Sequence, residues 1–310
     1  MTSLLQGQDI LRTDTLTDNE LDLILSTAAR FEDELEADGW LDNMAGQVMA
    51  ALFFEPSTRT RLSFESAMYR LGGDVITIAD PKTSSAAKGE SMADAVSVVE
   101  GYADVIVIRH PRKGSAAEAA EAVSVPVING GDGAGQHPTQ ALLDTYTIRK
   151  EKGTLDGLSV ALVGDLKNGR TVHSLVYLLA RFDIRLTFVS PQQLRMPSTI
   201  TEDLRAQGVR VSETEDLAAA MRESDVVYMT RIQKERFEDP AEYERLKGSY
   251  VLDLAMVEQA KGDMTIMHPL PRVNEIEEDV DDYPGAAYFR QSHNGVPVRM
   301  ALLALVTGRE

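Results

Sequence analysis

The sequence predicts an α/β fold of two doubly wound domains, each with a central parallel sheet flanked by helices. Short apolar runs rich in β-branched residues alternate with amphipathic segments, which is the pattern of βα units around a sheet buried on both faces. The 310 residues, 43% of them hydrophobic, suffice for two domains of ordinary size. A polar, glycine-containing link at residues 150–157 divides the candidate strands into two groups, so we place the domain boundary there.

The expected elements follow in order along the chain. Thr17 and Glu20 form a capping box before an apolar run, which predicts the start of the first helix. Apolar positions within residues 296–306 predict a closing helix that could pack on either domain. Between them we expect helices that alternate with strands at residues 48–54, 75–78, 105–108, 126–128, 159–163, 186–189, 226–229, 250–252 and 265–267.

The composition argues against several classes of protein. A net charge of −18 opposes a general affinity for nucleic acid. No stretch approaches the roughly 20 apolar residues of a membrane span. The N-terminal residues also lack the basic start and apolar core of a secretory signal, so we expect a cytoplasmic protein without a membrane partner. The acidic segments at residues 32–36 and 275–282 are expected to be solvated surface.

The sequence offers little to a metal or a cofactor. It contains no cysteine, which excludes disulfides, thiolate metal sites and cysteine nucleophiles. Neither G-x-x-x-x-G-K-[ST] nor G-x-G-x-x-G occurs, which lowers the expectation of a nucleoside triphosphate or a dinucleotide. We therefore expect chemistry that uses no metal and no cofactor.

The most informative segment is F-F-E-P-S-T-R-T-R at residues 53–61, where a buried strand gives way to a helix. A helix N-terminus presents unpaired backbone N–H groups and a positive dipole to an anion. Ser57, Thr58 and Thr60 add hydroxyl donors, and Arg59 adds a guanidinium suited to bidentate phosphate binding. Taken alone, however, the segment fits better a well-capped helix whose arginines are solvated.

Three further polar clusters follow candidate strands or loops and shift that balance. They are R-H-P at residues 109–111, Q-H-P-T-Q at residues 136–140 and H-P-L-P-R at residues 268–272. A single His-Pro pair is often only a turn. Open α/β sheets hold ligands at the carboxyl ends of their strands, so side chains from all of these clusters can converge on one cleft.

Five motifs, in this order, resemble those of aspartate carbamoyltransferase catalytic chains. They are S-T-R-T-R, G-D-G-x-x-Q-H-P-T-Q, V-G-D-L-K-x-G-R-T-V-H-S, Y-M-T-R-x-Q-K-E-R and H-P-L-P-R. The resemblance implies a carbamoyl phosphate domain at residues 1–150, onto which a final helix at 295–310 packs back. It also implies an aspartate domain at residues 151–294 and interdomain helices. The implied reaction moves the carbamoyl group of carbamoyl phosphate to the amino group of L-aspartate, an early step of pyrimidine biosynthesis.

The resemblance also implies roles at the carbamoyl phosphate site. The implied phosphate ligands are Ser57, Thr58, Arg59, Thr60 and Arg109. Thr60, Arg109 and His137 would be the catalytic groups, because they would also face the carbonyl oxygen, where attack by an amine develops negative charge that preorganised donors stabilise. Gln140 and the backbone carbonyl of Leu270 would hold the carbamoyl amino group.

Aspartate carries two carboxylates, which call for more than one fixed cation. By resemblance, Arg170 would bind the α-carboxylate, and Arg231 and Gln233 would bind the side-chain carboxylate. These last two residues alternate, as side chains on one side of an extended segment do. Leu270 and Pro271 would lie beside the bound aspartate.

Other implied residues concern assembly and closure. Ser84 and Lys88 match family residues that reach into the site of a neighbouring subunit, Lys88 toward both substrates, so a homotrimer with shared sites is implied. Glu55 would pair with Arg170 and Arg236 to set the closed arrangement of the domains. Some family members bind a separate regulatory chain, and the sequence leaves open whether this one does.

The expected mechanism is ordered. Carbamoyl phosphate binds first, and the domains then close over aspartate. The sequence leaves open which group takes the amine proton, and the departing phosphate is one candidate because it lies beside the reacting atoms. The nearest alternative is an ornithine or other amino-acid carbamoyltransferase, but the ornithine motif is H-C-L-P and Arg231 would repel a cationic side chain. The other is a catalytically silent binding or regulatory relative, which would usually have lost polar ligands that this chain retains.

Overall fold

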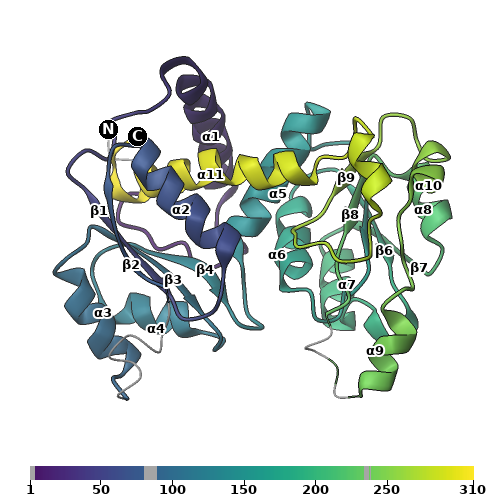
Figure 1. Cartoon of the computed structure of the whole chain (residues 1–310), viewed down its shortest axis with the longest axis horizontal. Helices are drawn as coiled ribbons and strands as arrows, with labels where there is room; N and C mark the ends of the chain where they lie inside the picture. Colours follow the sequence, from purple (N-terminus) through teal and green to yellow (C-terminus); the bar gives the residue numbers. More distant parts are fainter. Residues whose placement is uncertain (1–3, 80–88, 234–236, 238) are drawn as a thin grey trace. The chain divides into compact units, whose positions relative to one another are not determined.

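The computed structural model describes residues 4–79, 89–233, 237 and 239–310 (Figure 1). Contacts divide the chain into two compact units, unit 1 of Met1–Leu143 with Asn294–Glu310 and unit 2 of Asp144–His293. Both divisions fall inside helices, α5 (Pro138–Lys152) and α11 (Tyr288–Thr307). The prediction of two parallel α/β sheets joined by interdomain helices is confirmed.

Unit 1 contains a parallel sheet of strand order β2-β1-β3-β4. The strands are β1 (Val48–Phe53), β2 (Asp74–Ile78), β3 (Val105–His110) and β4 (Val127–Asp132). The helices that lie wholly in this unit are α1 (Asp18–Asp38), α2 (Thr58–Arg70), α3 (Met92–Glu100) and α4 (Ser115–Ala122). Strands β3 and β4 run further than predicted, so Arg109 and Asp132 are strand residues.

The apolar run of β1 is explained by burial on both faces of the sheet. Leu52 and Phe54 pack in a core cluster with Val96 of α3 and Ala119 of α4. Neighbouring positions such as Phe53 point the other way and are equally buried, because side chains alternate along a strand. Figure 1 shows α2 and α11 on the opposite side of this sheet from α3 and α4.

The two ends of the described chain meet in unit 1. The capping box at the start of α1 is confirmed, since the Thr17 hydroxyl accepts from Glu20 N at 3.3 Å and the Glu20 carboxylate accepts from Thr17 N at 2.7 Å. Gly7 N donates to Val306 O of α11 at 2.8 Å. The predicted closing helix is confirmed and begins earlier than expected, at Tyr288.

Unit 2 contains a parallel sheet of order β7-β6-β5-β8-β9. The strands are β5 (Ser159–Val163), β6 (Arg185–Val189), β7 (Arg210–Thr214), β8 (Val226–Met229) and β9 (Thr265–Met267). The helices are α6 (Arg170–Leu179), α7 (Ser198–Ala206), α8 (Leu217–Glu223), α9 (Pro240–Leu246) and α10 (Leu254–Glu258), with 3₁₀ turns η3 (Gln192–Leu194) and η5 (Glu278–Asp282). Figure 1 shows α6 on the other side of this sheet from α8 and α10.

Two strand predictions in unit 2 need correction. Residues 250–252 are not a strand, because only Leu252 forms an isolated bridge, with Ile276. Tyr250 and Leu252 pack in the core cluster beside the sheet, which explains why this segment has the apolar character that predicted a strand. Strand β7 was not predicted, since it is an edge strand with mostly exposed, polar side chains.

The acidic segment at residues 275–282 was wrongly predicted to be solvated surface throughout. Glu275 is only 4% exposed and accepts a hydrogen bond from His268 at 2.7 Å. Asp281 pairs with Arg272, with 2.7 Å between Oδ2 and Nη2. Separately, none of the helices that the structure describes combines the length and apolar character needed to cross a bilayer.

Candidate active site

The candidate residues follow the strands at which the strand order of each sheet reverses. The order reverses between β1 and β3 in unit 1, and between β5 and β8 in unit 2. Ligands of open α/β sheets bind outside the carboxyl ends of the strands at such switch points. Glu55 and Ser57 follow β1, and Arg231 follows β8, so sequence and topology select the same edges.

The N-terminus of α2 presents hydroxyl and guanidinium groups. Ser57 is the N-cap residue, in extended conformation (φ −157°, ψ 104°), and its side chain makes no capping hydrogen bond. Thr58 and Arg59 are exposed, whereas Thr60 is buried. The four side chains therefore range from solvent to interior around the free N–H groups of the first helical turn.

Arg109, at the end of β3, lies at the centre of the polar cluster in unit 1. Its Nη1 donates to Gly130 O at 3.2 Å and lies 3.5 Å from His137 Nε2. Its Nε lies 3.5 Å from Glu55 Oε2. Thr60 Oγ1 is also 3.5 Å from His137 Nε2. The structure thus brings together Glu55, Thr60, Arg109 and His137, which are separated by up to 82 residues in the sequence.

The glycine loop after β4 fixes the position of His137. The Asp132 carboxylate accepts from Gly114 N at 2.7 Å and from Gln136 N at 2.6 Å. Gly133 has φ +59°, and a Cβ there would lie 2.0 Å from Pro111 O, so only glycine fits. The chain then enters α5 at Pro138, which places His137 just before the helix and Gln140 in its first turn.

Asp132 had no predicted role, although the signal was present. A Gly-Asp-Gly run shortly after a predicted buried strand indicates a tight turn that the aspartate side chain braces. Here the aspartate braces the loop through its hydrogen bonds to Gly114 N and Gln136 N.

Asp165 organises the edge of unit 2 where β5 and β8 end. It is fully buried, and its Oδ1 accepts from Asn168 N at 3.0 Å. It also accepts a hydrogen bond from the backbone N–H of Gln233. Burial raises the pKa of this carboxyl, and the hydrogen bonds offset only part of the rise. Gly164, with φ +111°, lets the backbone pass close to Thr230, since a Cβ would lie 2.4 Å from Thr230 O. Asp165 was another residue without a predicted role, although it stands two residues after the end of a predicted strand.

The aspartate ligands predicted from resemblance follow the carboxyl ends of two neighbouring strands in unit 2, β5 and β8. Arg170 is the first residue of α6, after β5. Arg231 and Gln233 are half-buried on either side of the buried Ile232, which is the alternation of an extended segment. The hydrogen bond from Gln233 N to Asp165 connects the segment after β8 to the segment after β5.

The loop after β9 has an unusual backbone. Leu270 has φ +53°, and the Leu270–Pro271 peptide bond is cis. The ring of His268 accepts from Leu270 N at Nδ1, 2.8 Å away, so this nitrogen carries no proton and Nε2 donates to Glu275. Arg272 is held by Asp281 and lies over the Tyr288 ring, 5.3 Å from its centroid.

Some predicted residues are not placed. Ser84, Lys88 and Arg236 lie outside the described residues. Pairing of Glu55 with Arg170 and Arg236, and convergence of both units on one cleft, stay predictions. Across the described ranges, no three histidine or acidic side chains gather as a metal ion would require.

Fold and site together define an α/β protein with a cluster of hydroxyl, imidazole and guanidinium groups at the switch point of one sheet and guanidinium groups at that of the other. Family models agree with this division. Residues 8–150 match the aspartate/ornithine carbamoyltransferase carbamoyl-P binding domain, and residues 156–306 match the Asp/Orn binding domain of the same family. The chain belongs to the aspartate/ornithine carbamoyltransferase family.

Individual relatives point to one branch of this family. The chain is 54% identical over 303 residues to an aspartate carbamoyltransferase catalytic subunit of Thermococcus kodakarensis, covering 98% of each chain. It is 56% identical over 281 residues to that of Methanocaldococcus jannaschii, covering 90% of this chain and 91% of the relative. A crystal structure of Trypanosoma cruzi aspartate transcarbamoylase with carbamoyl phosphate and aspartate superposes with a TM-score of 0.93 at 42% identity, over 98% of each chain.

Proposed function

We propose that this chain transfers the carbamoyl group of carbamoyl phosphate to the amino group of L-aspartate, giving N-carbamoyl-L-aspartate and phosphate. The observation that carries the proposal is the cluster of Arg109, His137 and Thr60 at the N-terminus of α2. It combines a phosphate-binding helix end with buried donors beside it, as a phosphorylated acyl donor requires. A relative of 42% identity has been solved with both substrates.

Unit 1 binds carbamoyl phosphate in this proposal. Ser57, Thr58 and Arg59 hold the phosphate with the free N–H groups of α2. Arg109 and Thr60 of that helix both lie 3.5 Å from His137 Nε2, and Arg109 is proposed to contact both the phosphate and the carbonyl oxygen. Thr60, Arg109 and His137 then stabilise the charge that develops on this oxygen. Gln140 and the carbonyl of Leu270 hold the carbamoyl amino group.

Unit 2 binds aspartate. Arg170 receives the α-carboxylate, and Arg231 and Gln233 receive the side-chain carboxylate. Asp165 supports this, because it fixes the backbone of Gln233 without presenting its own charge to the surface. An ornithine side chain would bring a cation toward Arg231, so aspartate is the favoured acceptor.

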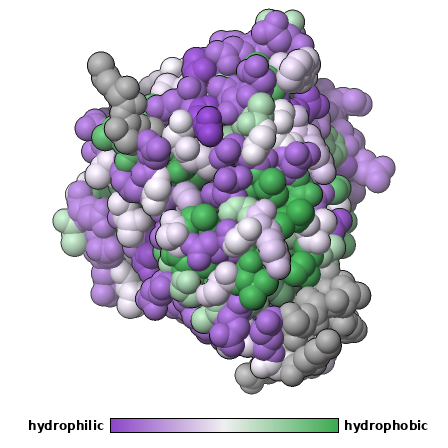
Figure 2. All heavy atoms as spheres, turned by 90° about the vertical axis from the view of Figure 1, so that its left-hand side faces the viewer, coloured by the Kyte–Doolittle hydropathy of each residue, from purple (hydrophilic) through white to green (hydrophobic). Residues whose placement is uncertain are grey.

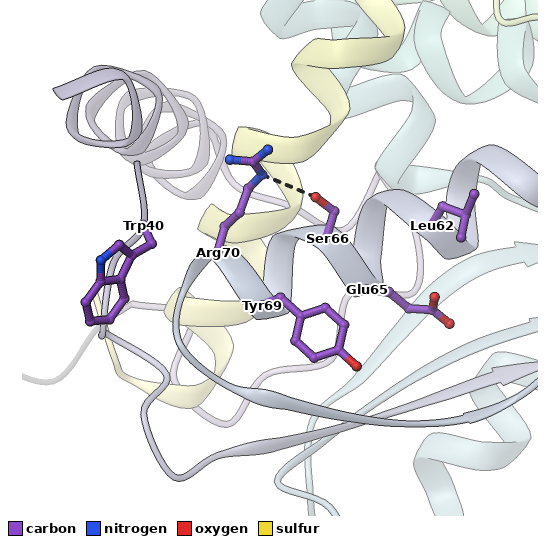
Figure 3. A pocket seen from close by; sticks show the side chains of 6 residues that line it. All are labelled: Trp40, Leu62, Glu65, Ser66, Tyr69 and Arg70. Carbon is purple, nitrogen blue, oxygen red and sulfur yellow. Dashed lines mark hydrogen bonds between the residues drawn. The ribbon is translucent and has the colours of Figure 1, made fainter. Parts of the chain in front are cut away.

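The proposed assembly is a homotrimer, with Ser84 and Lys88 completing the site of a neighbour. Its support is an apolar surface on unit 1, on the side that Figure 2 turns toward the viewer. Leu62 and Tyr69 of α2 are 50% and 57% exposed, and Trp40 is 63% exposed. Figure 3 shows that they border an open hollow along α2, together with the polar residues Glu65, Ser66 and Arg70. Exposed aromatic and aliphatic groups of this kind are typical of protein interfaces.

Sedimentation equilibrium tests the assembly. We expect a mass of three chains for the wild type and a smaller mass for Tyr69→Glu, whose charge would be buried in the interface. A monomeric wild type would contradict the homotrimer. A cytoplasmic location is an expectation from the sequence, which cell fractionation would test. The sequence leaves open whether a regulatory chain binds, and co-purification would decide this.

The reaction is tested by turnover of carbamoyl phosphate with aspartate and ornithine offered side by side. We expect carbamoyl aspartate and phosphate in equal amounts and no carbamoylated ornithine. Turnover of ornithine would favour the other branch of the family. Turnover of neither, by a chain that still binds phosphate, would favour a silent relative.

A further inference from the structure

The loop from His268 to Pro271 needs external support to keep its shape. Leu270 is the non-glycine residue with positive φ in the part of the chain that the structure describes. An L-residue in this region is strained and persists only where its surroundings fix it. The carbonyl of the same residue is assigned to the carbamoyl amino group above, so its direction matters for the reaction.

His268 holds the loop from within. Its ring joins Leu270 N to Glu275, with 2.8 Å and 2.7 Å between the bonded atoms. The second oxygen of Glu275 accepts from Val273 N and Asn274 N at 3.2 and 3.1 Å. These contacts set the internal shape of the loop but do not attach it to the rest of unit 2.

Gln291 of α11 attaches the start of the loop, whereas Arg272, just after it, is held by Asp281 and Tyr288. Gln291 Oε1 accepts from His268 N at 2.8 Å, and its Nε2 donates to Asp144 Oδ1 at 2.6 Å. Asp144 Oδ2 accepts from the Tyr228 hydroxyl at 2.7 Å. Each of these side chains is at most 1% exposed, so water cannot replace a lost hydrogen bond.

The polarity of this chain of hydrogen bonds is fixed by its members. Burial and the neighbouring Asp144 raise the pKa of Tyr228 well above its usual value, so Tyr228 stays a donor. Asp144 accepts from both neighbours. The amide of Gln291 must therefore turn its NH₂ toward Asp144, which leaves only its oxygen for His268 N–H. Asp144 lies four residues after Gln140, one helical turn along α5.

We infer that Gln291, oriented by Asp144, is a positioning residue that sets the direction of the Leu270 carbonyl by holding His268 N–H. It acts through the loop and touches no reacting atom. The inference rests on the proposed function for its effect on turnover, but its effect on the loop can be measured without turnover.

The test uses one charge change and its compensation. Gln291→Glu keeps an acceptor for His268 N–H but places a carboxylate against Asp144. In the double variant Asp144→Asn with Gln291→Glu, the introduced amide donates to the introduced carboxylate and accepts from Tyr228, so the three hydrogen bonds from Tyr228 to His268 described above are restored. Gln259→Glu makes the same chemical change at an exposed site of unit 2 and is the matched control.

Three quantities are measured in the full-length chain. In Gln291→Glu, we expect the amides of His268 and Leu270 to exchange hydrogen about tenfold faster, the effect of losing one buried hydrogen bond. We expect kcat with aspartate to fall by a similar factor, while the Kd of inorganic phosphate stays within about twofold, because phosphate binds to unit 1. The double variant should recover both exchange and kcat.

Two results would overturn the inference. One is exchange and kcat in Gln291→Glu that match the Gln259→Glu control. The other is a folded double variant that recovers neither. Should Gln291→Glu fail to fold, Gln291→Met removes both hydrogen bonds without adding charge and gives the same comparison. Absence of aspartate turnover in the wild type would refute the proposed function alone, since amide exchange still decides the role of Gln291.

Discussion

His137 Nε2 lies 3.5 Å from Arg109 Nη1, so a guanidinium and an imidazole from different strands and loops share one edge of the site. The contact is long for a hydrogen bond. A carbonyl oxygen placed between the two groups could accept from both. This arrangement is the basis of the proposed stabilisation of charge on that oxygen.

Removal of His137 should therefore affect catalysis more than binding. We expect His137→Ala to lower kcat about 100-fold or more, which is the usual cost of one donor to a developing oxyanion. Phosphate affinity should change little, since the phosphate ligands remain. Steady-state kinetics with carbamoyl phosphate and aspartate measure both. His293→Ala, which changes an exposed histidine, is the control, and a wild-type kcat in His137→Ala would refute the role.

Glu55 is expected to act on turnover rather than on phosphate binding. Its carboxylate lies 3.5 Å from Arg109 Nε, and by family resemblance it also pairs across the domains. We expect Glu55→Ala to lower kcat by about tenfold or more while the Kd of phosphate changes less than about threefold. Calorimetric titration with phosphate and kinetics give the two values. An equal loss in both would mean that Glu55 serves mainly to orient Arg109. Glu118→Ala, at an exposed ion pair of the same unit, should leave both unchanged.

The buried pair of His268 and Glu275 predicts how stability depends on pH. Burial alone would raise the pKa of Glu275, but the hydrogen bond from His268 and those from the backbone outweigh it, and the net pKa is below the usual 4.5. The unfolded chain then binds the proton more readily than the folded chain, so the pair stabilises the fold above pH 4.5. This stabilisation should be lost as the pH falls from there through the folded pKa.

Urea unfolding of the wild type and Glu275→Gln between about pH 3 and pH 6 checks this. The variant should be less stable by about 1–3 kcal/mol at the upper end, because the introduced NH₂ group faces backbone donors. The difference should shrink toward the acid end. A difference that is constant with pH would contradict the assignment.

The capping box of α1 predicts a separate effect on stability. Thr17→Ala removes the side chain that accepts from Glu20 N and should cost about 1 kcal/mol of unfolding free energy. Chemical denaturation measures the change, and Thr17→Ser should retain most of the stability. Turnover should not change in either variant, since α1 carries no predicted site residue.

The sequence predicted most of the fold because its strands are buried on both faces and therefore apolar. β7 escaped prediction for the opposite reason, since an edge strand such as Arg210–Thr214 needs few apolar side chains. The strand predicted at residues 250–252 was wrong because Tyr250 and Leu252 belong to the core, and core packing favours the same residue types as a buried strand. Local composition cannot separate those two causes.

Candidate site residues could be proposed from the sequence alone where they follow one another along the chain. Ser57 to Thr60 form one helix start, and their hydroxyl and guanidinium groups are of the kind that binds anions. The partners of His268 could not be predicted, because Glu275 stands in an acidic segment and Gln291 is distant in sequence. Asp144 and Gln291 are 147 residues apart, and no local pattern connects them.

The central claim is that the second substrate is acidic and binds Arg231. Its most direct test compares carbamoylation of aspartate and of ornithine by the wild type, Arg231→Ala and Arg222→Ala. Arg222 is an exposed arginine of the same unit. We predict turnover of aspartate alone, a kcat/KM lower by about 100-fold in Arg231→Ala, as for loss of a charged hydrogen-bonding partner, and no change in Arg222→Ala. Undiminished aspartate turnover in Arg231→Ala, or a wild type that carbamoylates ornithine, would contradict it.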